Sequence, residues 1–558
     1  MIFTRELSVA QLEYIEVTLF SLPGARSKGV DLRTSGVKAI IAALAVVAVA
    51  SAAVAITQTN RADSAGRSNR ALESRLDRAE KRLAELEEER SQEGDDPLGD
   101  LLGGGDGGLA ELLGGDISDL LGGDSAGLIE CLAGGGGTDA LDGLLGDIAG
   151  GGSGNAEDLL GDLFGGLGGD SSGGPARSQI PKISSAVEDV RKLKFRDKVD
   201  VTFMPPQRLA RRAARLFLED YPSSVARTEQ KLLSALGAIP RNMNLRATTK
   251  RLLKSQVAGF YVPSDKTLFV PGNRKQDLSA IEKTVIAHEL QHALADQRLD
   301  LPNPDETDPS RMDESIAALS LVEGDATLTM QRYSLAAIPM FEQLTILSDP
   351  AYAASQQALE GIPTYLVEQL QFPYIDGLNF ACDLHKKGGW RAVNKAYDDP
   401  PSTTAQVLFP ARYRRGEDGA PVRPPRGPGA GWKESFDSSF GAANLMWLFK
   451  APGGNEDAAL SDPLDRVSAW GGGRVSTWSR SDDVAVAVTL VQRAGETGLC
   501  ESVAEWYEAA FDDDGDAATR GSEVMALEGS QDAVLICSDD KVRLGIAPDL
   551  ATARAVSR

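Results

Sequence analysis

Two histidines four residues apart place the tightest constraint on this chain of 558 residues. His288 and His292 bracket the sequence His-Glu-Leu-Gln-His, and the whole chain contains only three histidines. Residues four apart on a helix lie on the same face, so the two imidazoles can reach one metal ion. Glu289 follows the first histidine, where a carboxylate can take a proton from water beside the metal. The pattern therefore predicts a helix that carries a zinc site and a general base.

The sequence around the motif favours this helix. Ser279 and Glu282 have the spacing of a capping box, which marks a helix start. The apolar residues expected to form its buried face are Ile281, Val285, Ile286, Leu290, Ala293 and Leu294. The alternative is a chance pair of surface histidines, which the scarcity of histidine in this chain disfavours.

A catalytic zinc site needs a third protein ligand and one open position. No other histidine lies nearby, so we expect a carboxylate from a second predicted helix at residues 312–333. Glu323 is the best candidate, and Gly324 beside it would let another backbone come close. Each acid in this helix can also lie on a solvated face, as most acids do. The competing acids are Asp325, Asp313 and Glu314.

The segment from His288 to Asp296 resembles the active-site helix of the gluzincin superfamily of zinc metallopeptidases, which in thermolysin-type enzymes reads His-Glu-Leu-x-His-Ala-x-x-Asp. In that family the third ligand is a glutamate on the next helix, a role that the resemblance gives to Glu323. Thermolysin-type enzymes carry an aspartate four residues after this glutamate, whereas this chain has Thr327 there and an acid at Asp325. The resemblance therefore extends to the superfamily and not to close kinship with thermolysin.

A nearer resemblance is to poorly characterised exported bacterial zincin-like proteins. It covers roughly residues 181–537 and implies a zincin-like domain with Zn²⁺ that hydrolyses peptide bonds in a protein or peptide substrate. A non-catalytic cell-envelope scaffold or binding protein on a zincin fold is the alternative. Glu289 favours the enzyme, because a structural zinc needs no base. Beside the metal motif, the resemblance rests on Gly259-Phe260-Tyr261, Glu323-Gly324-Asp325-Ala326, Pro373-Tyr374, Gly388-Gly389-Trp390 and Gly471-Gly472.

Other residues are assigned supporting roles. Asp296, one turn beyond His292, and Asp325 are expected to support the ligands, although Asp296 can equally be an ordinary helix-end acid. Tyr374 is our candidate donor to the oxyanion that develops on the substrate, with a place in the core as its alternative. His385 is expected at the surface. The other tyrosines considered as donors are Tyr333, Tyr365 and Tyr413.

Two short strands are predicted before the metal helix, at residues 259–262 and 267–270 around a turn at 263–266. A strand in this place can pair with an extended peptide substrate. An ordinary hairpin that closes a sheet is an equally good interpretation. The two readings differ in whether an edge of this sheet faces the metal.

The N-terminal third is predicted to carry the protein to a membrane. Residues 39–57 form an apolar run long enough to span a bilayer, after a cytoplasmic segment at 1–38. We expect an uncleaved single-pass anchor in the cell membrane, with cleavage as a signal peptide as the alternative. Basic residues flank both sides equally, so the charges give no orientation. The extracellular placement of the catalytic domain rests on cysteine usage and the resemblance.

Two further segments follow the apolar run. Leucines spaced four and three apart at residues 61–92 predict a short coiled coil that would make the protein a homo-oligomer, with a single helical stalk as the alternative. Residues 93–180 are a low-complexity acidic linker rich in Gly, Asp and Leu, which we expect to be disordered. Residues 91–176 contain no lysine or arginine.

The remaining chain predicts an α+β fold, with a helix-dominated zincin-like domain at residues 181–415 and a C-terminal α+β region at 416–558. These can be one large domain or two closely packed ones. Cys500 and Cys537 can form a disulfide or remain small buried residues. The formal net charge of −23 and the absence of a basic stripe argue against nucleic acid as a partner.

Overall fold

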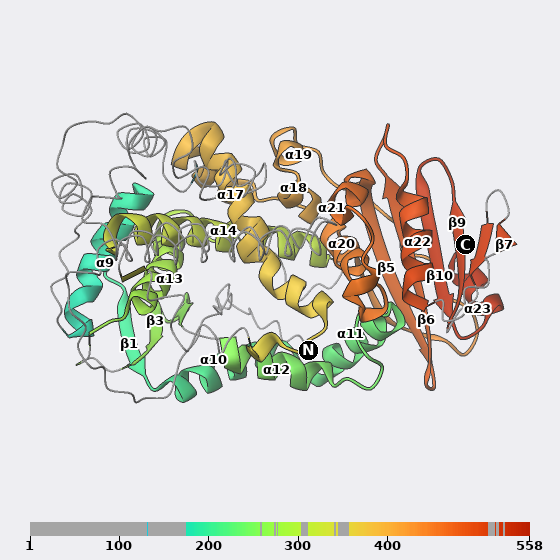
Figure 1. The fold of residues 1–558 in the computed structure, drawn as a ribbon, viewed down its shortest axis with the longest axis horizontal. Coiled ribbons are helices and arrows are strands. Elements are labelled where there is room, and N and C mark those ends of the chain that lie inside the picture. Colours follow the sequence, from blue (N-terminus) through green and yellow to red (C-terminus); the bar gives the residue numbers. More distant parts are fainter. Residues whose placement is uncertain are drawn as a thin grey trace, which may run out of the picture. The chain divides into compact units, whose positions relative to one another are not determined.

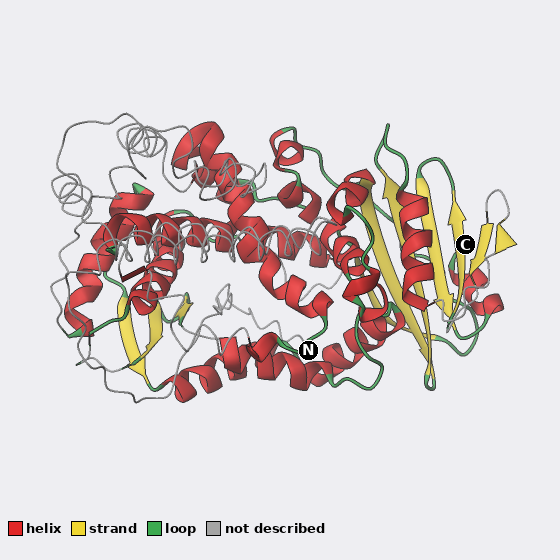
Figure 2. Ribbon diagram, viewed as in Figure 1, coloured by secondary structure: helices red, strands yellow, loops and turns green. Residues whose placement is uncertain are grey.

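The computed structural model describes Cys131 and residues 175–558, apart from 257–258, 273–274, 276, 303–310, 340–341, 344–356, 512–518, 521–523 and 528–530. The predicted segments at 1–38, 39–57 and 61–92 lie outside the described residues, as does the linker up to residue 174 except Cys131. Within the described part, no helix has both the length and the apolar character needed to cross a bilayer. The described chain mixes helices and sheets, as expected of an α+β fold (Figures 1 and 2).

The folded chain begins earlier than predicted. Helix α9 covers Ala176–Arg191, so the predicted end of the linker at residue 180 is wrong. Its buried residues Ile180, Ile183 and Val187 recur at helical spacing and pack inward. Pro181 lies inside this helix and cannot donate the backbone hydrogen bond that another residue would make there.

A three-stranded sheet lies beside the site. β1 (Asp200–Met204) pairs in parallel with β3 (Thr267–Pro271), and β2 (Phe260–Val262) pairs antiparallel with the other side of β3. The order β1-β3-β2 leaves β2 at an edge. The predicted hairpin and its turn are confirmed. Helix α10 (Pro206–Asp220) covers this sheet through a small apolar cluster that includes Leu209 and Phe269.

Three helices carry the residues of the predicted metal site. α13 (Ala280–Arg298) begins with the predicted capping box of Ser279 and Glu282. α14 covers Met312–Ala337, and α17 covers Thr364–Asp398. α17 continues through Pro373 and deviates from helical geometry only at Gly389. The packing of Phe372 and Phe380 in the core offsets the unfavourable proline.

A seven-stranded antiparallel sheet forms the C-terminal part, in the order β4-β5-β6-β10-β9-β8-β7. Helices α20 (Ala442–Lys450) and α22 (Leu499–Phe511) pack on one face, and α23 (Leu550–Val556) packs on the other. A disulfide between Cys500 and Cys537 joins α22 to β9, as the sequence allowed. The strands are β4 (Lys433–Ser439), β5 (Trp470–Arg480), β6 (Asp483–Gln492), β7 (Thr519–Arg520), β8 (Val524–Leu527), β9 (Asp532–Cys537) and β10 (Lys541–Ala547).

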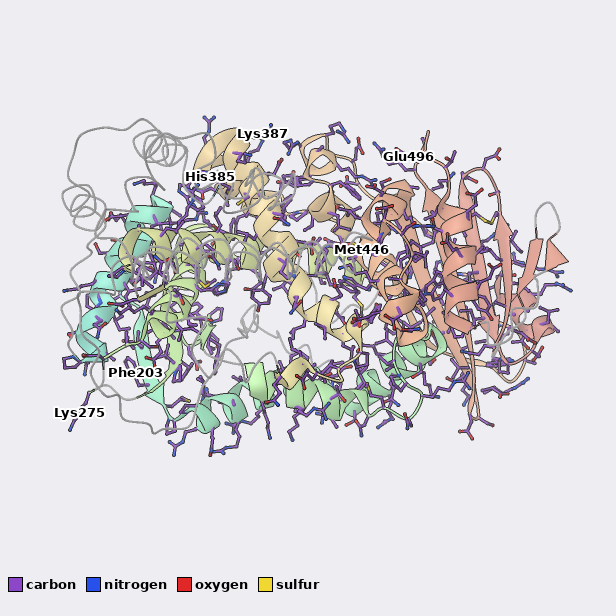
Figure 3. All side chains as sticks on the ribbon, in the orientation of Figure 1. Phe203, Lys275, His385, Lys387, Met446 and Glu496 are labelled. Carbon is purple, nitrogen blue, oxygen red and sulfur yellow. A yellow bond between two sulfur atoms is a disulfide. The ribbon has the colours of Figure 1, made fainter. Side chains whose placement is uncertain are left out.

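Shorter elements connect these parts. Helices α11 (Ser223–Ala235) and α12 (Leu245–Gln256) follow α10. The short helices of the later chain are α18 (Thr404–Leu408), α19 (Pro410–Arg414), η2 (Pro452–Gly454), η3 (Glu456–Ala458), α21 (Pro463–Arg466) and η4 (Val467–Ala469). Figure 3 shows the side chains on this ribbon, with Lys387 and Glu496 at its periphery.

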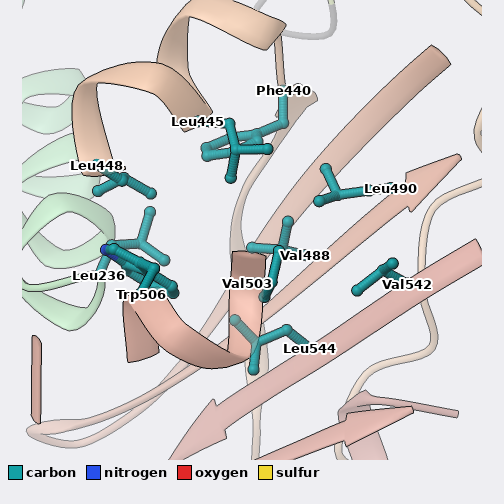
Figure 4. Close-up of a pocket in the computed structure, with 10 residues that line it drawn as sticks. All are labelled: Leu236, Phe440, Leu445, Leu448, Val488, Leu490, Val503, Trp506, Val542 and Leu544. Carbon is teal, nitrogen blue, oxygen red and sulfur yellow. The ribbon is translucent and has the colours of Figure 1, made fainter. Parts of the chain in front are cut away.

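One hydrophobic core joins the helical part to the large sheet. It contains Leu321 of α14, Trp447 of α20 and Val488 of β6, so residues on both sides of position 415 pack together. This packing agrees with a single compact unit that comprises residues 173–330 and 348–558. An apolar pocket lies within this core, between α20, α22 and the sheet (Figure 4). The metal-site residues do not line it, so we interpret it as a packing gap.

Candidate metal centre

The structure brings the three predicted ligands together. The Nε2 atoms of His288 and His292 lie 2.9 Å apart. The Oε2 atom of Glu323 lies 3.1 Å from the first of these nitrogens and 3.4 Å from the second. All three side chains are buried, with at most 2% of their surface exposed. Two imidazoles and one carboxylate therefore converge on one point in the interior.

The spacing of these atoms fits a zinc ion. In a tetrahedral site with zinc bonds of about 2.0–2.1 Å, neighbouring ligand atoms lie about 3.3 Å from one another. The three observed separations run from 2.9 to 3.4 Å. Two nitrogens and one oxygen are also a donor set that zinc accepts in catalytic sites.

The three helices place these ligands by simple geometry. His288 and His292 are one turn apart on α13, so their rings share a face. Glu323 comes from α14, and its neighbour Gly324 packs against α17: a Cβ there would overlap the carbonyl oxygen of Gly377. The prediction that Gly324 lets another backbone approach is confirmed.

The imidazoles keep Glu323 ionised. Burial alone raises the pKa of this carboxyl, but the charge of His292 and the hydrogen bonds from both imidazoles outweigh it and lower the pKa to about 2. Glu323 is thus a carboxylate, the form that binds metal ions.

Glu289 lies against the edge strand. It is fully buried on α13, next to the ligand His288. A Cβ at Gly259 would lie 3.4 Å from its Cγ atom and 3.1 Å from Val285 Cγ1. Glycine immediately before β2 therefore lets the chain pass close to the predicted base, which sequence reasoning did not find.

Asp296 joins the metal helix to the same strand. Its Oδ2 atom accepts a 2.7 Å hydrogen bond from the hydroxyl of Tyr261 on β2. Burial and the neighbouring carboxylate raise the pKa of Tyr261, so the hydroxyl keeps its proton and donates. Asp296 therefore links α13 to β2.

Asp325 contacts a different set of partners from those expected. Its carboxylate forms a two-bond ion pair with Arg191 of α9, at 2.9 Å for each bond. It also accepts hydrogen bonds from Gln291 of α13 and Tyr397 of α17, both at 2.8 Å. The guanidinium of Arg191 lies 4.3 Å from the centre of the Trp390 ring. Asp325 thus supports the site by linking four helices instead of by contacting an imidazole.

Tyr374 of α17 lies beside the cluster. Its ring centre is 6.2 Å from that of His288. Two other tyrosines have partners elsewhere: Tyr365 accepts from Asn444, and Tyr413 donates to the backbone of Asp399. Tyr333 is buried on α14.

The remaining candidates lie elsewhere. Asp313 binds Thr404, and Glu314 pairs with Arg311, so neither joins the metal cluster. His385 is only partly buried and packs edge-on against Trp390, within 4.7 Å between ring centres. In the view of Figure 3 it lies near Lys387.

Comparison with known proteins finds no match for this chain among family models, curated proteins or solved structures. The resemblance to gluzincins therefore stays a prediction.

Proposed function

We propose that this protein is a zinc-dependent metallopeptidase. The observation that carries the proposal is the convergence of His288, His292 and Glu323 within 4.8 Å of one another, with Glu289 next along the helix. A ligand set of two histidines and a glutamate is one that hydrolytic zinc sites use.

Each residue then has a role. His288, His292 and Glu323 would hold Zn²⁺, which lowers the pKa of water and polarises a carbonyl when bound. Glu289 would accept the proton from water and return it to the leaving amine. Tyr374 would donate a hydrogen bond to the oxygen of the scissile carbonyl. The residues of β2 are at most 2% exposed, which favours a hairpin that closes the sheet over a strand that pairs with a peptide.

A second function has one observation in its favour. The three ligands and Glu289 are almost entirely buried, and closed sites are typical of structural zinc. A scaffold or binding protein with a structural metal would have this property. Structural sites use four protein ligands, however, whereas the metal-ligating cluster in the described residues contains three.

Substitution of Glu289 separates these functions. Glu289→Gln in the full chain should retain about one zinc per molecule and lose roughly 10²–10⁴-fold in kcat on casein, because general-base catalysis contributes a factor of this size. The measurements are zinc content by atomic spectroscopy and release of labelled fragments.

His292→Ala is the matched control and should lose both zinc and activity, since it removes a ligand. Full cleavage by the Glu289→Gln chain would refute the role of this residue. A native chain with bound zinc and no chelator-sensitive cleavage would favour the scaffold.

A further inference from the structure

Helices α10 and α12 concentrate positive charge in a chain that is strongly acidic as a whole. Residues 206–254 contain eleven lysines and arginines and only three acids, whereas the formal net charge of the chain is −23. The two helices pack side by side. Their exposed cations are Arg208, Arg211 and Arg215 on α10 and Lys250, Arg251 and Lys254 on α12, and we call these six residues the cationic patch.

The cationic patch pairs with none of the acidic side chains that the structure describes. By contrast Arg212, on the same helix, pairs with Asp265 and lies over Phe269. Exposed like charges on adjacent helices repel, and an anionic partner would relieve that repulsion.

The patch adjoins the strand that passes the predicted base. Arg212 of α10 holds the ring of Phe269 on β3 at 4.3 Å, and β3 pairs with β2. α12 ends at Gln256, three residues before Gly259, whose backbone lies against Glu289. The helices that carry the patch therefore lie next to the small sheet, which in turn contacts the metal helix α13.

The surroundings favour a polypeptide over a membrane or a nucleic acid. The apolar side of α10 is buried against the sheet through Leu209 and Ala213, so this helix has no apolar face to insert into lipid. The described residues expose no aromatic side chain on which a nucleic-acid base would stack. An acidic peptide needs charge complementarity, which the six exposed cations provide.

We propose that the cationic patch binds acidic stretches of a polypeptide substrate of the metal site. This inference rests on the proposed function, because it names the substrate class of the same site. It assigns specificity to six residues that contact neither the metal ligands nor Glu289.

Binding is tested in the Glu289→Gln full chain, which prevents turnover. The probe is a fluorescent poly-L-glutamate peptide, measured by anisotropy against salt concentration. Two variants remove the patch in halves: Arg208→Gln with Arg211→Gln and Arg215→Gln, or Lys250→Gln with Arg251→Gln and Lys254→Gln. Arg423→Gln with Arg426→Gln is the matched control, because these exposed arginines lie outside both helices.

We expect each half-patch variant to bind the probe about tenfold more weakly, and the control pair to bind like the parent. Binding should also weaken as salt rises. Unchanged affinity in both half-patch variants would overturn the inference. So would tighter binding, through the same six residues, to duplex DNA or to vesicles of phosphatidylglycerol.

Kinetics separate this inference from the function on which it rests. In the active chain, the half-patch variants should raise KM for an acidic peptide and leave kcat and the KM of a neutral peptide unchanged. Equal KM values in parent and variants would refute the role of the patch in substrate binding and leave the proposed peptidase activity standing. Patch-dependent binding of poly-L-glutamate without cleavage of any peptide would refute the peptidase activity and leave the binding of acidic polypeptides standing.

Discussion

Asp325 supports the metal site indirectly, through contacts with neighbouring helices. It lies two positions after Glu323 and forms a fully buried ion pair with Arg191, while Gln291 brings the metal helix into the same network. A buried pair contributes little by itself, because desolvation offsets the attraction. Removing one partner is different, since the other charge is then left buried and uncompensated.

Asp325→Asn should therefore lower the free energy of unfolding by about 3–5 kcal/mol, measured by urea denaturation. Arg191→Met should have a similar effect, and the double variant should lose less than the sum of the two. Asp483→Asn breaks an exposed pair with Arg480 and is the control, with an expected loss below about 1 kcal/mol. Additive losses at Asp325 and Arg191 would contradict the network.

For single residues, the sequence predicts those positions that helical periodicity determines. His288 and His292 had to share a face, and Glu323 was the best candidate among the acids of the next helix, the one that the resemblance selects. The partners of Asp325 gave no such signal, because Arg191 is 134 positions away. Gln291, inside the motif itself, was the one visible hint of a polar contact on the other side of the helix.

The crossing of α14 and α17 is the contact between elements on which the site depends most. Gly324 and Gly377 face each other there, and a Cβ on either would overlap backbone of the other helix. Gly324→Ala should lower the free energy of unfolding by about 1–3 kcal/mol through overpacking. It should also weaken zinc binding, because the proposed ligand Glu323 immediately precedes it. Unchanged stability and zinc affinity, by urea denaturation and competition with a chelator, would argue against so close a crossing.

Elements with a regular pattern were predictable, and elements shaped by close backbone approach were not. The hairpin of β2 and β3 and the capping box of α13 were anticipated because turn residues and cap spacing mark them. β5 was missed, since three glycines at 471–473 disfavour a strand. There, a Cβ at Gly473 would overlap the carbonyl oxygen of Phe440, so glycine is required by packing.

At the start of α14, the buried acid Asp313 connects the helical part of the molecule to the large sheet. Asp313 accepts hydrogen bonds from the backbone and hydroxyl of Thr404 on α18, and its own backbone N–H donates to Ser439 at the end of β4. The helix that supplies Glu323 is thereby connected to the seven-stranded sheet. Burial raises the pKa of Asp313 to about 6, although the bonds from Thr404 oppose the shift.

This raised pKa makes the stability of the molecule depend on pH. The folded chain holds the Asp313 proton more tightly than the unfolded chain, whose pKa is near the ordinary value of 3.8. The stabilisation is complete below pH 3.8 and is lost as the pH rises through 6. At 1.36 kcal/mol per pKa unit, the loss amounts to about 3 kcal/mol.

Asp313→Asn keeps an acceptor for Thr404 and removes the titration. Relative to this variant, the native chain should therefore lose about 2.4 kcal/mol of unfolding free energy between pH 4 and pH 7. Urea denaturation with a chelator present measures the difference, because the metal ligands then contribute equally to both chains. Asp539→Asn replaces an exposed acid and is the control. Its unfolding free energy should change with pH in the same way as that of the native chain. Parallel curves for Asp313→Asn would mean that this carboxyl titrates alike in the folded and unfolded chains, and that the junction of α14 with the sheet is open to water.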